Sequence, residues 1–287
     1  MKPPPFDYAA ATSVDHAVSL LNGGRDARVI AGGQSLMPLL NLRLAGPELV
    51  VDIGRIPDLG TVTIDPTDGA LVIGANVTQA EVAAHPDVAA GWPVLVDAIR
   101  LIGHAQIRNR GTICGSLAHN DPLAELPAVA VAFNADVAVI SPAGQRTVAA
   151  TDLFAGPFMT TLAGGDLIVA VRFPAPRAGS TGAIREFATR TGDYATAGVV
   201  CRLDLADGAV SGARVVVFGL GSGPIRMNGV EAALVGATAP TIDDGVLAAS
   251  IAALEPPDDV HASAATRTEL AAVLITEAVA EAWERGQ

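Results

Sequence analysis

The segment VIAGGQSLMPLLNLRLA, residues 29–45, limits what the chain can fold into more than any other stretch. An apolar run typical of a strand stops at Gly32 and Gly33, and an apolar run typical of a helix starts at Ser35. A strand that is followed at once by a helix leaves backbone N–H groups of the first turn without partners. The junction therefore predicts an α/β unit with a phosphate site at the start of its helix. Neither G-x-G-x-x-G nor the lysine of a Walker A motif follows, so the two common nucleotide-binding motifs are absent.

A second segment of small residues, RGTICGSLAHNDP, spans residues 110–122. We interpret it as a glycine-rich loop, with Asp121 as the N-cap of a following helix and Pro122 at its first position. Glu125 is then expected in the first turn, where the helix dipole favours a carboxylate. Two such segments on separate lobes would grip a diphosphate from both sides, because glycine lets the backbone approach the phosphate oxygens. Either segment taken alone is equally compatible with an ordinary turn.

The first part of the chain predicts an α/β lobe. Ser13 is the expected N-cap of a helix that ends at Gly23, and Ser35 is the expected N-cap of a second helix. Short β-rich runs at 27–30 and 48–53 are the expected strands.

The remainder predicts a second lobe and a separate C-terminal region. A hairpin is expected at the turn 142–144, and another at Asp207-Gly208. The end of the chain has helical spacing, and the residues expected to share one apolar face are Leu270, Val273, Leu274 and Ala278.

These patterns together predict an α+β fold built from α/β lobes. We expect a two-lobe domain over 1–176, with lobes at about 1–56 and 57–176. A smaller α+β domain with a β-sheet and helices is expected over 177–287, after a Pro-rich boundary.

Composition restricts the function. The 287 residues carry a net charge of −12, which argues against nucleic acid or an anionic membrane surface as a partner. The N-terminus lacks the apolar core of a signal peptide and no run is long enough for a transmembrane segment, so a cytoplasmic protein is expected. Two cysteines, Cys114 and Cys201, do not suffice for an iron–sulfur cluster, and the five histidines show no metal-binding spacing. Any metal centre is expected on another chain.

The motifs AGGQS (31–35), HAQIRNRGT (104–112) and TICGSLAHNDPLAELP (112–127) resemble one known family. They are similar to the FAD-binding medium subunit of molybdenum hydroxylases, the relatives of carbon monoxide dehydrogenase and xanthine dehydrogenase. The resemblance continues through GDYATAG and DVHASAATR and covers essentially the whole chain. It implies a PCMH-type, vanillyl-alcohol-oxidase-like FAD-binding fold.

The resemblance also implies roles for individual positions. The two segments would cradle the FAD pyrophosphate, Asp121 would lie near ribityl or ribose hydroxyls, Leu162 would pack on the flavin region, and Tyr194 would lie beside the isoalloxazine ring and limit its exposure to solvent. The implied cofactor-binding residues are Ile30, Ala31, Gly32, Gly33, Gln34, Ser35, Leu36, Thr112, Ile113, Cys114, Gly115, Ser116, Asp121, Leu162 and Tyr194. No catalytic or metal-ligating side chain is implied, because the flavin carries the chemistry.

Three positions depart from the family pattern. Cys114 stands where many relatives have glycine, so a positive φ there would be strained. Its thiol is either a reactive group in a nest of N–H groups or, as we prefer, a small buried residue. Glu186 stands where several relatives carry a basic residue, and Thr266 where an aromatic one is common.

The function implied is that of an electron-transfer flavoprotein subunit. The partners would be a large molybdenum-pterin subunit and a small subunit with two [2Fe–2S] clusters. FAD on this chain would pass electrons to a quinone, a cytochrome, NAD or oxygen. Two alternatives stay open, which are a stand-alone FAD-dependent oxidase or dehydrogenase and a non-catalytic scaffold subunit.

Overall fold

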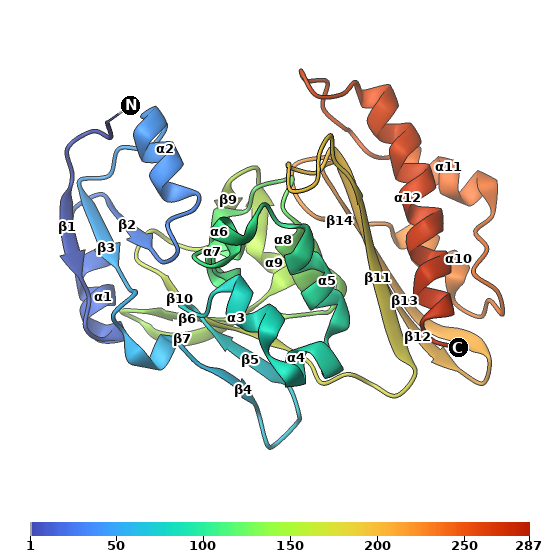
Figure 1. Cartoon of the computed structure of the whole chain (residues 1–287), viewed down its shortest axis with the longest axis horizontal. Helices are drawn as coiled ribbons and strands as arrows, with labels where there is room; N and C mark the ends of the chain where they lie inside the picture. The colour runs from blue at the N-terminus through green and yellow to red at the C-terminus, as the bar shows by residue number, and fades with distance from the viewer. Residues whose placement is uncertain (1) are drawn as a thin grey trace.

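The computed structural model describes residues 2–287, which form three parts along the chain (Figure 1). The first lobe is a parallel three-stranded sheet in the order β1-β3-β2. As predicted, the Ser13 side chain caps the first helix by accepting a hydrogen bond from the N–H of His16. The elements of this lobe are β1 (Asp7–Ala10), α1 (Val14–Leu21), β2 (Ala27–Ile30), α2 (Leu36–Leu42) and β3 (Leu49–Asp52).

The second lobe holds an antiparallel five-stranded sheet in the order β4-β5-β10-β6-β7. Its strands are β4 (Val62–Ile64), β5 (Leu71–Gly74), β6 (Asp136–Ser141), β7 (Gly144–Ala149) and β10 (Leu167–Phe173). The predicted hairpin at 142–144 is confirmed as the β6–β7 turn. A short 3₁₀ turn, η1, covers Pro57–Leu59, and β8 (Phe154–Gly156) pairs with β9 (Met159–Thr160).

The helices of the second lobe lie between its sheet and the C-terminal domain (Figure 1). They are α3 (Gln79–Ala84), α4 (Pro86–Gly91), α5 (Pro93–Leu101), α6 (Ala105–Arg108), α7 (Ile113–His119), α8 (Glu125–Ala132) and α9 (Ala150–Leu153). Helix α1 of the first lobe contacts β6 and β10, so the two lobes share one apolar core.

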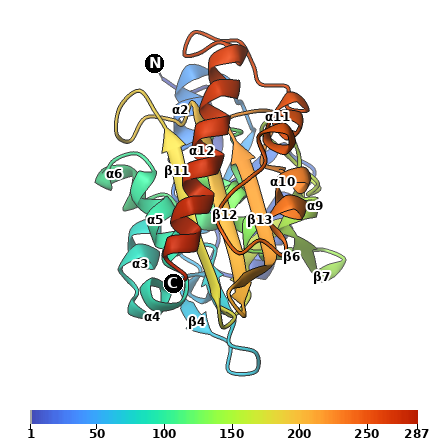
Figure 2. The same ribbon diagram turned by 90° about the vertical axis from the view of Figure 1, so that its right-hand side faces the viewer.

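The C-terminal domain is a four-stranded sheet in the order β11-β12-β13-β14 with helices on its outer face (Figure 2). Along β12, Val200 belongs to the core shared with α8, whereas Val199 and Cys201 belong to the core under the outer helices. This alternation follows the two-residue period of a strand. The elements are β11 (Ser180–Phe187), β12 (Ala197–Ala206), β13 (Ala209–Phe218), β14 (Ile225–Arg226), α10 (Asn228–Leu234), α11 (Asp244–Ala252) and α12 (Ala264–Glu284).

The second hairpin turns as predicted, because Asp207 and Gly208 both have positive φ, at 51° and 76°. The α+β fold assembled from α/β lobes is likewise confirmed.

The segment 110–122 is the main error of the sequence analysis. It is not a loop, because α7 starts after Thr112, whose Oγ1 accepts from the N–H of Gly115 at 3.0 Å. Asp121 does not cap α8 either, since that helix begins only at Glu125. Asp121 instead closes a local turn, in which its Oδ1 accepts from the N–H of Leu123 at 3.0 Å.

Two smaller expectations are also wrong. Ser35 has αR backbone angles and makes no capping hydrogen bond through its side chain. Val273 is 55% exposed, because the buried face of α12 runs through Ala271, Leu274 and Ala278. The expected position of Glu125 in the first turn of α8 is confirmed.

Candidate functional site

The two glycine segments lie in direct backbone contact. A Cβ added to Gly32 would lie 1.9 Å from the carbonyl oxygen of Arg110 and 2.9 Å from the Cα of Gly111. No side chain fits at that distance, so glycine is required for the close approach. Gly33 has a φ of +72°, which is the left-handed region that favours glycine.

The same two segments carry backbone donors that have no protein acceptor. Within residues 2–287, the amides of 33–36 donate no hydrogen bond to another protein atom, and neither do those of Ile113 and Cys114. The Gln34 side chain folds back so that its Nε2 donates to the carbonyl of Gly32 at 3.0 Å. Free N–H groups on two segments that touch each other form a setting suited to phosphate oxygens.

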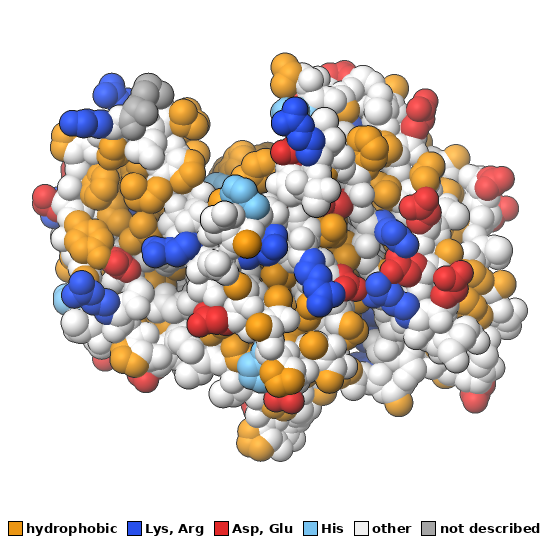
Figure 3. Space-filling view, viewed as in Figure 1, with side chains coloured by type: hydrophobic (Ala, Val, Ile, Leu, Met, Phe, Trp, Pro, Cys, Tyr) orange, Lys and Arg blue, Asp and Glu red, His pale blue; other side chains and the backbone are white. Residues whose placement is uncertain are grey.

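A cavity of about 610 Å³ opens beside the first segment and reaches toward the C-terminal domain. The space-filling view shows the molecule hollowed between the first lobe and the rest (Figure 3). The walls of the cavity come from α2, the segment after α7, the β8–β9 turn, the loop between β11 and β12, the loop after β13 and the segment between α11 and α12. Four of the sequence-predicted residues line this cavity, namely Gln34, Ser35, Asp121 and Tyr194.

The other sequence-predicted residues do not line the cavity. Leu162 is one of them, and the others belong to the two segments that meet at Gly32. These others are Ile30, Ala31, Gly32, Gly33, Leu36, Thr112, Ile113, Cys114, Gly115 and Ser116.

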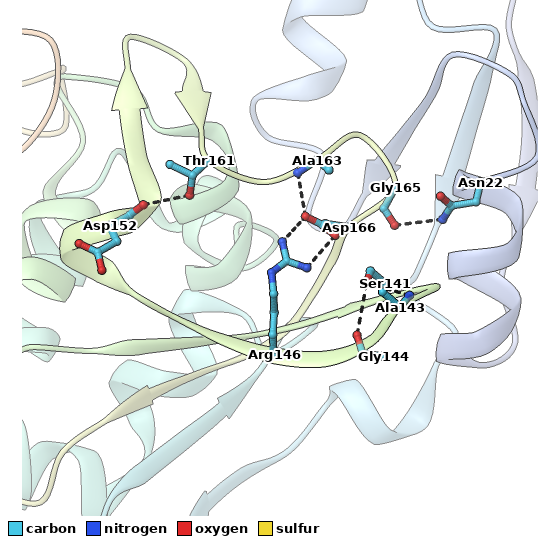
Figure 4. A network of polar contacts seen from close by, with 10 residues as sticks. All are labelled: Asn22, Ser141, Ala143, Gly144, Arg146, Asp152, Thr161, Ala163, Gly165 and Asp166. Atoms are coloured by element: carbon cyan, nitrogen blue, oxygen red, sulfur yellow. Dashed lines mark hydrogen bonds and ion pairs between the residues drawn. The ribbon is translucent and has the colours of Figure 1, made fainter.

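The segment from Thr161 to Asp166 is attached to both lobes (Figure 4), and Leu162 belongs to this segment. From the second lobe, Nη1 of Arg146 donates to Oδ1 of Asp166 at 2.9 Å, and a second contact joins the same two side chains. From the first lobe, Nδ2 of Asn22 donates to the carbonyl of Gly165 at 3.1 Å. The loop that carries Leu162 is therefore fixed relative to both lobes.

Asn120 organises one wall of the cavity and was not singled out from the sequence. It is fully buried with a φ of 46°, and its Nδ2 donates to the carbonyls of Gly156 at 2.7 Å and Met159 at 2.9 Å. The backbone carbonyl of Asn120 accepts a hydrogen bond from the N–H of Phe158 at 2.9 Å. The Phe158 ring, which lines the cavity, packs against the His119 ring with 5.2 Å between centroids.

Two carboxyl groups near this wall have no cationic partner among the described residues. Glu125 is 7% exposed, and burial together with the charges of Glu186 and Asp121 raises its pKa to about 8. Burial raises the pKa of Glu186 to about 7, and its Oε2 is buried without a hydrogen-bond partner in residues 2–287. At Glu186 the chain therefore presents a carboxyl group that holds its proton to a higher pH than an ordinary glutamate.

This arrangement predicts a pH-dependent stability. Glu125 has a usual pKa of 4.5 and a folded-state pKa of about 8, so between these values only the folded state keeps the proton. Its contribution is fully present below pH 4.5 and is lost as the pH rises through about 8. We expect Glu125→Gln to reduce the fall in the free energy of unfolding between pH 5 and pH 8.5, as measured by urea denaturation of the full chain without ligand. One proton accounts for a fall of at most about 1.4 kcal/mol in the free energy of unfolding per pH unit. The same fall with pH in Glu125→Gln as in the wild type would contradict this prediction.

Cys114 is a buried structural residue. It is 3% exposed, it lies in α7 with no positive φ, and burial raises the pKa of its thiol to about 12. The strain expected at this position is therefore absent, and so is the lowered pKa of a reactive thiol. Cys201 is fully buried, and its thiol pKa is also raised by burial.

Both thiols are expected to resist modification. Iodoacetamide at pH 8 should leave Cys114 and Cys201 unmodified in the native full chain and label both in urea, because alkylation requires an accessible thiolate. Mass spectrometry of the peptides measures this directly. Rapid labelling of Cys114 in the native protein would show that its thiol is reactive.

Comparison with known proteins shows the family to which the chain belongs. Residues 4–176 match the model of the "FAD binding domain in molybdopterin dehydrogenase", and residues 182–282 match the "CO dehydrogenase flavoprotein C-terminal domain". In the part of the chain that the structure describes, no helix is long and apolar enough to cross a membrane.

Close relatives match along their whole length. The chain is 41% identical to the 6-hydroxypseudooxynicotine dehydrogenase complex subunit alpha of Paenarthrobacter nicotinovorans, over 100% of this chain and 97% of that protein. Carbon monoxide dehydrogenase from Hydrogenophaga pseudoflava, in a form that lacks the Mo-pyranopterin moiety, has a chain with a TM-score of 0.93 and 37% identity, and the match covers 99% of both chains. A chain of quinoline 2-oxidoreductase from Pseudomonas putida 86 matches with a TM-score of 0.90 and 34% identity, and the match covers 99% of both chains. The chain belongs to the family of FAD-binding medium subunits of molybdenum hydroxylases, which are flavoprotein subunits of oxidoreductase complexes.

Proposed function

We propose that this chain holds FAD between its two glycine segments and relays electrons from the [2Fe–2S] clusters of a small partner subunit to an external acceptor. A large partner subunit would carry the molybdenum-pterin centre at which the substrate is oxidised. The acceptor would be a quinone, a cytochrome, NAD or oxygen. The unit that binds FAD would be 1–176, with 177–287 completing the medium subunit.

The observation that carries this proposal is the contact at Gly32. A Cβ on Gly32 would collide with the Arg110 carbonyl, and the amides of 33–36, Ile113 and Cys114 have no acceptor in residues 2–287. The residues present therefore fit a pyrophosphate, which needs close backbone approach and N–H donors rather than a lysine. The adjoining cavity, at about 610 Å³, is in the size range of cofactor sites.

The remaining roles are proposed for Asp121 and Tyr194, which line the cavity, and for Leu162, which does not. Asp121 uses Oδ1 in its local turn, and its carboxylate keeps acceptor capacity for ribityl or ribose hydroxyl groups. Leu162 would pack on the flavin region from its doubly attached loop. Tyr194, which is 68% exposed, would cover the isoalloxazine ring and restrict the access of water.

Bound FAD would supply the redox chemistry, because it exchanges electrons singly and in pairs. The protein would bind and orient it. The Glu125 carboxyl has a pKa of about 8 and so holds a proton at neutral pH. It therefore adds little negative charge near Asp121, which lines the cavity. No side chain of this chain is assigned a role as nucleophile or general base.

The test compares the chain in its native complex with the chain alone. We expect the complex to contain FAD and to show flavin bleaching on addition of the complex's organic substrate, whereas the FAD-loaded chain alone should not bleach. Flavin bleaching in the isolated chain would instead support a stand-alone flavin enzyme. A complex without flavin would support a scaffold subunit.

A further inference from the structure

Arg267, near the start of α12, is a fully buried cation outside the segments that hold FAD by our proposal. Its side chain is 1% exposed. Nη2 donates to Oδ2 of Asp259 at 2.6 Å, and Nη1 donates to the carbonyl of Gly219 at 3.0 Å and also to that of Thr196. One guanidinium group therefore joins three segments that are far apart in the sequence.

One of these partners lines the cavity, and the other two each lie two residues away from a lining residue. Thr196 lies two residues after Tyr194, Gly219 itself lines the cavity, and Asp259 lies two residues after the lining residue Pro257. The Gly219 N–H also donates to the carbonyl of Pro122 at 2.9 Å, and Pro122 is part of the wall formed by the second lobe. The contacts of Arg267 thus connect the C-terminal walls to one another and to the FAD-binding domain.

The chemistry of the contact requires arginine. A buried charge is tolerated only when it is paired and hydrogen-bonded, and Asp259 supplies the opposite charge. The Arg267 guanidinium lowers the pKa of the Asp259 carboxyl to about 2, so this partner is ionised at neutral pH. A guanidinium reaches three acceptors from a planar fork, whereas an ammonium group is a point charge on a flexible stem.

We propose that Arg267 is a positioning residue for the flavin, because it fixes the Tyr194 loop, the Gly219 loop and the segment before Asp259 around the isoalloxazine ring. The inference rests on the proposed function, since it requires that FAD occupies the site. Arg267 lines no part of the cavity itself, and it acts through the three segments that it joins.

The test uses the full chain loaded with FAD and the variants Arg267→Lys, Arg285→Lys and Tyr194→Leu. Arg285 is the matched control, because it follows α12 at its other end and also holds two carboxylates, Asp97 at 2.8 Å and Glu281 at 2.6 Å, away from the cavity. We expect Arg267→Lys to weaken FAD binding by about tenfold or more and to raise the fluorescence of bound flavin, and Arg285→Lys to change both by less than about twofold. FAD binding unchanged in Arg267→Lys would overturn the inference.

A coupling measurement separates positioning from general stability. If Arg267 acts by placing Tyr194, then Arg267→Lys should raise the fluorescence of bound flavin much less in the Tyr194→Leu background than in the wild type. Equal effects in both backgrounds would contradict the positioning role. Should Arg267→Lys not fold, Asp259→Asn takes its place, with a loss of affinity of about threefold or more expected. A wild-type chain that binds no FAD would refute the proposed function. If the wild type binds FAD and Arg267→Lys binds it with the same affinity, only this inference would be refuted.

Discussion

Gly32→Ala is expected to abolish FAD binding. The added Cβ would lie 1.9 Å from the carbonyl oxygen of Arg110, and that neighbour is backbone, which cannot rotate away as a side chain would. The two glycine segments must therefore separate by an ångström or more, and the donors for the pyrophosphate separate with them. We expect a loss of affinity of at least about 100-fold, which is the size of effect that a misplacement of about 1 Å can have on orientation-dependent catalysis.

The matched control for this variant is Gly164→Ala. A Cβ on Gly164 meets no atom of residues 2–287 within 4 Å and the φ of Gly164 is not positive, so this change adds the same methyl group without a collision. Fluorescence titration with FAD should show wild-type affinity for Gly164→Ala. If Gly32→Ala bound FAD within about threefold of the wild type, the contact between the segments would not be the basis of the site.

Asn120→Ala is expected to destabilise the chain by about 2–4 kcal/mol, because it removes two hydrogen bonds made by a fully buried side chain and leaves a cavity in its place. The lost bonds are those to Gly156 at 2.7 Å and Met159 at 2.9 Å, which hold the turn that carries Phe158. Alanine also fits the left-handed φ of 46° less well than asparagine. Urea denaturation measures the change, and FAD affinity should fall with the loss of this wall.

Asn134→Ala controls for the backbone part of that effect. Asn134 has a similar φ of 50° but is exposed, and it makes no side-chain hydrogen bond to the described residues. Asn134→Ala should therefore lower the free energy of unfolding by only about 1 kcal/mol, which is the cost of placing alanine in the left-handed region. Equal losses in the two variants would mean that the contacts of Asn120 contribute nothing.

Local sequence signals predicted much of the fold. The Ser13 cap, the Asp207-Gly208 hairpin and the first strand–helix junction depend on neighbouring residues, and each is present in the structure. Helix α7 was missed because TICGSLAH contains β-branched residues, glycine and serine, all of which have low helix propensity. Burial of Ile113, Cys114 and Leu117 in the core favours the helix instead.

The candidate site was predicted only in part, because local sequence signals do not show contacts between residues that are far apart in the sequence. The glycine segments are visible as motifs, but the partners of Asn120 lie 36 and 39 residues away in sequence, and those of Arg267 include residues 48 and 71 positions away. No local pattern marks such contacts. The C-terminal wall of the cavity, including Gly219 and Pro257, likewise depends on how the domains pack.

The most direct test of the account is a titration of the purified full chain, freed of ligand, with FAD, FMN and riboflavin. If the two glycine segments bind the pyrophosphate, one FAD should bind per chain, and riboflavin, which lacks phosphate, should bind at least about 100-fold more weakly. FMN should be intermediate, because it offers one phosphate to donors arranged for two. Riboflavin binding as tightly as FAD, or no binding of FAD at all, would contradict the account.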